Sequence, residues 1–166
     1  MPLRIDLQIA ADGCEVPADA DWQTWIGAAL SGGGRDESGI VTVRLVADDE
    51  SAALNSSYRN KAGPTNVLAF PGPGDELEEI ARELGRDTEL GDLVICWPVA
   101  CREADEQGKR PVAHLAHLVV HGTLHLIGYD HIQDADAESM EHLEVRILDE
   151  LGFANPYAGP GQTGDS

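Results

Sequence analysis

Alternating apolar and polar residues predict four short β-strands in this chain. Residues 3–9 alternate strictly, which is the two-residue period of a strand with one buried face. Residues 40–46 also alternate, though less strictly, and are rich in β-branched side chains, which favour strands. We place the four strands at residues 3–9, 40–46, 66–70 and 92–96.

A recurrence of apolar residues every three to four positions predicts helices between and after these strands. The most apolar helix covers residues 112–127, and Gly128 can end it because glycine readily adopts positive φ. Residues 76–84 have weak helical character and strong negative charge, so we expect a solvated insertion there. We place the helices at residues 18–30, 48–58, 98–107, 112–127 and 134–151.

A single hydrophobic core accounts for all of these elements. The chain has 166 residues, of which 42% are hydrophobic, and both values are typical of one packed domain. No apolar period continues after Phe153, so we expect residues 154–166 to form a flexible C-terminal tail. We therefore predict one α+β domain over residues 1–153, with a small mixed β-sheet of about four strands packed against helices.

The charge balance limits what the protein can bind. Thirty acidic residues against eleven basic ones give a net charge of −19. Binding of nucleic acid by broad phosphate neutralisation requires many Lys and Arg contacts, so the composition argues against that mode. A small local basic site is still compatible with it.

The sequence also bears on the cellular compartment. No stretch approaches the roughly 18–20 consecutive apolar residues of a membrane span, and the first residues do not resemble a secretory signal. We expect a cytoplasmic protein with no membrane partner. In such a compartment Cys14, Cys96 and Cys101 are expected to be reduced.

Histidines gather on the most apolar predicted helix. His121 and His125 lie one turn apart on one face, so both rings can reach a common ion. His117 lies about 12 Å from His125 along the axis at ~1.5 Å per residue. Zinc–nitrogen bonds of roughly 2.0–2.1 Å cannot bridge that distance. An unbroken helix therefore offers two ligands to one metal ion.

A third ligand requires the chain to turn back after the helix. Gly128 allows such a turn, and His131 follows three residues later. Three neutral imidazoles with an open fourth position are typical of catalytic zinc sites, whereas structural sites close with four protein ligands. We predict one zinc ion per chain, bound by His121, His125 and His131.

The remaining histidines fit packing or surface roles better. We expect His114 and His117 to be packing or polar-face residues, or to support the metal ligands from behind. His142 is expected to face solvent.

Residues 121–131 read HGTLHLIGYDH and closely resemble the HGxLHLxGYDH signature of the YbeY endoribonuclease family. The segments NSSYR at 55–59, PTNVLAFP at 64–71 and GDLVIC at 91–96 resemble further motifs of that family, and together they span most of residues 40–153. The sequence departs from the family pattern at Asn66, where Asp is common, and at Ala69, where Ser is common. The acidic stretch 75–89 is longer than the usual connection.

The resemblance implies a zinc-dependent endoribonuclease specific for single strands, acting in maturation of the 3′ end of small-subunit ribosomal RNA and in ribosome quality control. It implies that the three motif histidines bind zinc and that Arg59 takes part in the activity. The implied partners are single-stranded and ribosomal RNA, the small ribosomal subunit with one of its proteins, and a ribosome-assembly GTPase. We expect a zincin-like domain with its metal site on a central helix.

Two other classes share part of this pattern. Metzincin-type peptidases have the same histidine spacing, but they place a glutamate general base directly after the first histidine, where this chain has Gly122. A non-catalytic ribosome-assembly factor with a stabilising zinc is the third alternative.

For hydrolysis of RNA, Arg59 can clamp a phosphate with two parallel hydrogen bonds, and Lys61 can extend a small basic patch. Asp130 can orient a zinc ligand or cap the turn, and the general base is not identified.

Overall fold

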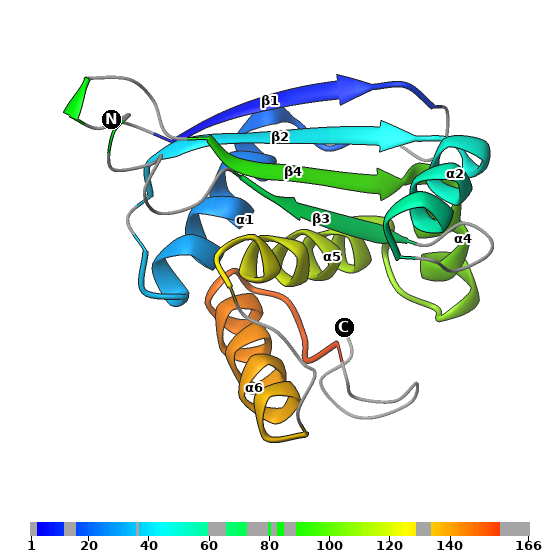
Figure 1. Cartoon of the computed structure of the whole chain (residues 1–166). Coiled ribbons are helices and arrows are strands. Elements are labelled where there is room, and N and C mark those ends of the chain that lie inside the picture. Colours follow the sequence, from blue (N-terminus) through cyan, green and yellow to red (C-terminus); the bar gives the residue numbers. More distant parts are fainter. Residues whose placement is uncertain are drawn as a thin grey trace.

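A mixed four-stranded sheet forms the framework of the protein (Figure 1). The computed structural model describes residues 3–11, 16–35, 37–59, 66–72, 80, 83–84, 89–128 and 134–156, with only the backbone for residues 57–59 and 134–137. The strands are β1 (Leu3–Ile9), β2 (Gly39–Val46), β3 (Val67–Pro71) and β4 (Glu89–Cys96), in the order β1-β2-β4-β3. The first three in that order run parallel and β3 runs antiparallel to β4, so the predicted mixed sheet is confirmed.

The described part of the chain also contains five helices at the predicted places. They are α1 (Asp19–Gly32), α2 (Asp48–Arg59), α4 (Trp97–Glu106), α5 (Pro111–Leu126) and α6 (Asp134–Glu150). Helix α5 begins with a proline, whose fixed φ suits the first turn. It ends just before Gly128, which has the positive φ of 103° expected from the sequence. Of the predicted insertion 76–84 the structure describes only residues 80, 83 and 84, and of the predicted tail only 154–156.

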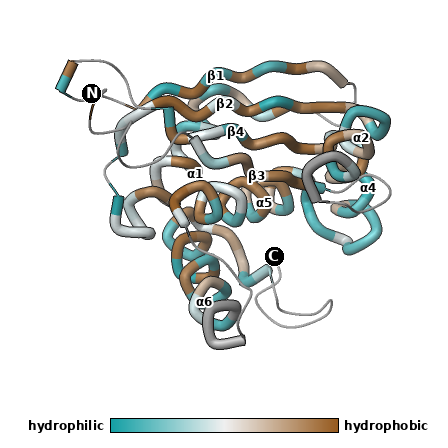
Figure 2. The backbone as a smooth tube through the Cα atoms, in the orientation of Figure 1, coloured by the Kyte–Doolittle hydropathy of each residue, from teal (hydrophilic) through white to brown (hydrophobic). Residues whose placement is uncertain are grey.

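Helices α1 and α5 cover one face of the sheet, and α6 packs against both of them on the side away from the strands (Figure 1). Helix α5 also contacts β3, β4 and α4, so it is the central helix of the fold. Its apolar side chains join those of β2, β4 and α1 in one core, and Figure 2 shows the hydrophobic residues along these elements. The core is built on large buried side chains, among them Trp22, Leu30, Leu93, Leu124 and Met140.

Helix α5 lies unusually close to the sheet at Gly122. A Cβ atom at this position would meet Leu93 Cδ2 at 2.8 Å and Val67 Cγ2 at 3.3 Å. Leu93 is fully buried in β4 and Val67 begins β3, so the space is closed by the sheet itself. The missing side chain at 122 therefore sets the distance between the helix and the strands.

Two cysteines lie among the described residues, and they differ in whether the sulfur is bonded to another cysteine. Cys96 is a free, buried thiol that donates a hydrogen bond to Asp48 Oδ1 at 3.3 Å, and burial raises the pKa of this thiol. Cys101 takes part in a disulfide, so the expectation of reduced cysteines is wrong for this residue. Cys14 lies outside the described residues.

None of the helices in the described segments is long and apolar enough to cross a membrane.

Candidate metal centre

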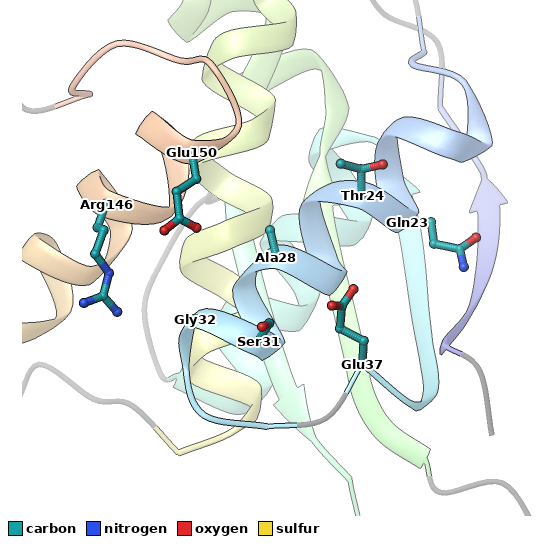
Figure 3. Close-up of a pocket in the computed structure, with 8 residues that line it drawn as sticks. All are labelled: Gln23, Thr24, Ala28, Ser31, Gly32, Glu37, Arg146 and Glu150. Atoms are coloured by element: carbon teal, nitrogen blue, oxygen red, sulfur yellow. The ribbon is translucent and has the colours of Figure 1, made fainter.

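A cavity of about 740 Å³ lies between α1 and α6 and is shown in Figure 3. Its described lining includes Gln23 and Thr24 of α1, Glu37, and Arg146 and Glu150 of α6. These lining residues include none of the predicted site residues. Two of the predicted zinc ligands, His121 and His125, lie instead on α5.

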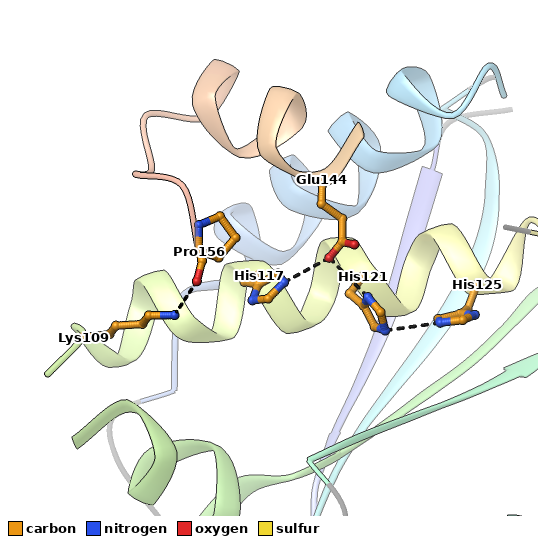
Figure 4. Close-up of polar contacts among 6 residues, drawn as sticks. All are labelled: Lys109, His117, His121, His125, Glu144 and Pro156. Carbon is orange, nitrogen blue, oxygen red and sulfur yellow. Dashed lines mark hydrogen bonds and ion pairs between the residues drawn. The ribbon is translucent and has the colours of Figure 1, made fainter. Parts of the chain in front are cut away.

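His121 and His125 point toward one another on α5 (Figure 4). Their Nε2 atoms are 3.2 Å apart and their ring centroids 4.7 Å apart. The one-turn spacing predicted from the sequence is therefore realised with the same nitrogen of each ring facing inward. Each ring is partly exposed, the His121 side chain by 28%, so a solvent-borne ligand can reach them.

The separation of the two nitrogens fits a zinc ion. Two nitrogens bound at roughly 2.0–2.1 Å to a tetrahedral zinc ion are roughly 3.3–3.4 Å apart. The observed 3.2 Å agrees with that value. Neutral imidazole is also a nitrogen donor of the kind that zinc prefers. The pair therefore has the chemistry and the spacing of two zinc ligands.

The predicted third ligand, His131, lies outside the described residues, as does Asp130. Within the segments that the structure describes, no group of three or more His, Cys, Asp and Glu side chains is placed to hold a metal ion. The complete triad of His121, His125 and His131 therefore stays a prediction.

A buried carboxylate from α6 supports the histidine pair from behind. Glu144 Oε1 lies 3.0 Å from His117 Nε2 and 3.2 Å from His121 Nδ1 (Figure 4). The Glu144 side chain is fully buried, with 0% exposure. A carboxylate oxygen only accepts hydrogen bonds, so both facing ring nitrogens carry protons. One oxygen atom thus links two histidines of α5 to α6.

The surroundings of Glu144 favour its charged form. Burial alone raises the pKa of a carboxyl group, because the charged form loses its hydration. The hydrogen bonds from His117 and His121, together with the Coulombic attraction of the two rings, outweigh this effect and lower the pKa of Glu144 to about 2. The site therefore carries a negative charge next to two imidazole rings.

Glu144 was not among the residues predicted for the site, although the sequence contains a signal for it. It lies on the same face of α6 as Met140, Ile147 and Leu148, which are buried hydrophobic residues. A glutamate on the apolar face of an amphipathic helix must find partners, because an unpaired buried charge is very costly. That pattern alone marks Glu144 as a residue with polar partners in the core.

The other three histidines occupy different environments. His114 is buried and packs against α4, where its Nε2 lies 3.0 Å from Glu103 Oε1, and burial lowers the pKa of His114. His117 supports the candidate centre through Glu144. His142 is exposed on α6, as expected.

Arg59 is the last residue of α2, and only its backbone is described. Lys61 lies outside the described residues. The contribution of these two residues to phosphate binding therefore stays a prediction from the sequence and the resemblance.

Comparisons with known proteins define the class first. The family model described as Endoribonuclease YbeY matches residues 10–152, which is most of the chain. The chain is also 46% identical over 158 residues to the Endoribonuclease YbeY of Nitrosococcus oceani, covering 95% of this chain and 98% of that protein. Both matches are to a family of endoribonucleases. This protein belongs to the Endoribonuclease YbeY family, and the resemblance found in its motifs is confirmed.

A solved structure shares the fold. The solution structure of TM1509 from Thermotoga maritima matches with a TM-score of 0.52 and 24% sequence identity, over 94% of this chain and 99% of that one. At this identity the likeness concerns the fold alone. It agrees with the α+β arrangement described above.

Proposed function

We propose that this protein is a zinc-dependent, single-strand-specific endoribonuclease that acts in maturation of the 3′ end of small-subunit ribosomal RNA and in ribosome quality control. The observation that carries the proposal is the 3.2 Å approach of His121 Nε2 and His125 Nε2 on the central helix. Membership in a family of endoribonucleases supports the RNA substrate. In this proposal the enzyme works in the cytoplasm.

His121 and His125, with His131 as third ligand, would hold one zinc ion. When bound, zinc supplies a Lewis acid that activates water near neutral pH and polarises a phosphoryl oxygen. The Nδ1 atom of His121 faces Glu144 at 3.2 Å, which leaves Nε2 as the ring nitrogen that faces His125. The partial exposure of His121 leaves room for a substrate phosphate to approach.

Arg59 is proposed to bind the substrate phosphate. Its guanidinium group can donate two parallel hydrogen bonds to phosphate oxygens and stays charged at any physiological pH. With a net charge of −19, the protein as a whole repels RNA. The substrate must therefore be held by a few local cations, and contacts with the small ribosomal subunit, one of its proteins and a ribosome-assembly GTPase are proposed to add affinity.

The structure adds an argument against the metzincin-type protease. A side chain at position 122 would meet Leu93 and Val67, so this position faces the sheet. A carboxylate placed there would enter a closed apolar contact. A general base in the manner of those peptidases therefore has no room next to the first histidine.

Cleavage of single-stranded RNA by the purified protein tests the proposal. Activity should disappear with a zinc chelator, return when zinc is added, and be absent from His121→Ala and His125→Ala. His142→Ala, which changes an exposed histidine, is the matched control and should cleave normally. Cleavage that survives complete zinc removal contradicts the proposal. Zinc binding without any RNA cleavage favours the non-catalytic assembly factor, and zinc-dependent cleavage of unstructured peptides favours the protease.

A further inference from the structure

The unexpected feature of the site is the double use of one carboxylate oxygen. Glu144 Oε1 accepts hydrogen bonds from His117 Nε2 at 3.0 Å and from His121 Nδ1 at 3.2 Å. All three side chains lie at the contact between α5 and α6, and Glu144 itself has 0% exposure. The carboxylate is therefore closed to solvent, whereas the side chains of His117 and His121 remain 16% and 28% exposed.

The two nitrogens of an imidazole ring point to different sides and have different roles. A neutral ring carries one proton, and the hydrogen bond made by one nitrogen decides which nitrogen keeps the lone pair. In His121 the proton faces Glu144 on Nδ1, so the lone pair belongs to Nε2. That Nε2 atom is the one that lies 3.2 Å from His125 Nε2.

We propose that Glu144 is a positioning residue of the metal centre, which fixes the ring and the tautomer of His121 so that Nε2 is ready to bind zinc. This inference rests on the proposed zinc site. His117 is the second donor that holds the carboxylate in place. Glu144 is not itself a ligand, because it contacts the side of the ring opposite to the one that faces His125.

Packing alone does not account for a glutamate at this position. Its neighbours along the same face of α6 are Met140, Ile147 and Leu148, each almost completely buried. Replacement of buried ion pairs by hydrophobic residues is often neutral or stabilising, so stability gives little reason for a carboxylate here. Partners that orient a metal-bound histidine, in contrast, are a regular part of metal sites, and their loss typically lowers metal affinity about 10- to 100-fold.

Zinc affinity of Glu144→Gln tests the inference, measured by competition with a chromophoric chelator. We expect affinity about 10- to 100-fold below that of the unmodified protein, because a neutral amide is a weaker acceptor for the two ring protons. Glu141→Gln changes an exposed glutamate on the same helix and should bind zinc normally. Full zinc affinity in a folded Glu144→Gln protein overturns the inference.

A second measurement needs no variant. Long-range ¹H–¹⁵N NMR of the zinc-free protein reports which nitrogen of His121 carries the proton. Protonation on Nδ1 is expected, and protonation on Nε2 overturns the inference even if Glu144→Gln fails to fold. In folded Glu144→Gln the preference for Nδ1 should weaken, which a merely structural role of Glu144 does not predict.

Neither measurement uses RNA, so a failure of the proposed role of Glu144 can be distinguished from a failure of the proposed nuclease activity. A protein that binds zinc through His121 but does not cleave RNA contradicts the proposed nuclease and leaves the role of Glu144 supported. A protein that binds no zinc overturns both.

Discussion

Glu103 on α4 binds His114 on α5 through the same carboxylate oxygen that accepts a hydrogen bond from Asn66. The distances to Oε1 are 3.0 Å from His114 Nε2 and 3.1 Å from Asn66 Nδ2. The backbone carbonyl of Asn66 in turn accepts from the N–H of Cys96, at the end of β4. The contact at Glu103 therefore joins the start of α5 to the sheet, whereas the similar contact at Glu144 joins the middle of α5 to α6.

The burial of His114 predicts a loss of stability at mildly acidic pH. Burial lowers the pKa of His114 below its usual value of 6.5, so the unfolded chain binds a proton more readily than the folded one. The free energy of unfolding should therefore be highest above about pH 6.5. It should fall as the pH drops from 6.5 toward the pKa of His114 in the folded state. Urea unfolding measured between pH 8 and pH 5 checks this.

A variant assigns that pH dependence to His114. His114→Gln should show a smaller fall between these pH values, and His142→Gln, at an exposed position, should follow the unmodified protein. Parallel curves for the unmodified protein and His114→Gln would show that another group is responsible.

Removal of one predicted metal ligand should remove the metal. We expect His121→Ala to lose the single zinc ion of the unmodified protein, as measured by elemental analysis, while His142→Ala retains it. Zinc should raise the melting temperature of the unmodified protein and of His142→Ala but not of His121→Ala, because a ligand at 100 times its Kd stabilises the folded state by about 2.7 kcal/mol. Undiminished zinc in His121→Ala contradicts the predicted ligand set.

Reversal of charge at Arg59 should separate substrate binding from metal binding. Arg59→Glu is expected to keep its zinc and to change the free energy of unfolding by no more than about 0.5 kcal/mol, as is usual for surface substitutions. RNA cleavage should be lost, because a carboxylate there repels the substrate phosphate. Arg102→Glu, an exposed arginine on α4, is the matched control and should cleave RNA. Normal cleavage by Arg59→Glu would exclude a role for Arg59 in the activity.

The close contact at Gly122 predicts that even a methyl group is destabilising there. Alanine is favoured over glycine in a helix by about 1 kcal/mol, but overpacking of a well-packed core costs about 1–3 kcal/mol. Because Leu93 is fully buried and has little freedom to move, we expect Gly122→Ala to lower the free energy of unfolding by about 1 kcal/mol net.

Chemical denaturation of Gly122→Ala, Leu93→Val and the double variant checks the cause. If the added methyl group collides with Leu93, the double variant should be more stable than the sum of the single effects implies. Simple additivity, or a stabilised Gly122→Ala, would show that the helix can move away from the sheet.

The local sequence pattern was sufficient to predict the helices and strands, and to predict the pairing of His121 with His125 in the candidate site. The alternation in residues 40–46 correctly predicted β2, whose residues Val41, Val43 and Leu45 are fully buried, because the period of two reports which face meets the core. The pairing of His121 with His125 followed from the pitch of one helix. The order of the strands and the role of Glu144 did not follow, because periodicity identifies a buried face without identifying its partner. Glu144 meets His121 across 23 residues of sequence, and only the packing of α6 on α5 brings the two together.

The sequence separations within the fold differ between the site and the sheet. The contact of His117 with Glu144 spans 27 residues, whereas the pairing of Val41 with Gly91 between β2 and β4 spans about twice that length of chain. Each doubling of a loop adds about 0.6 kcal/mol to the entropic cost of closing it. The α5–α6 contact therefore closes a shorter loop than the central strand pair does. We expect the speed of folding to be set by the β2–β4 pairing, with the histidines and their carboxylate meeting at lower entropic cost.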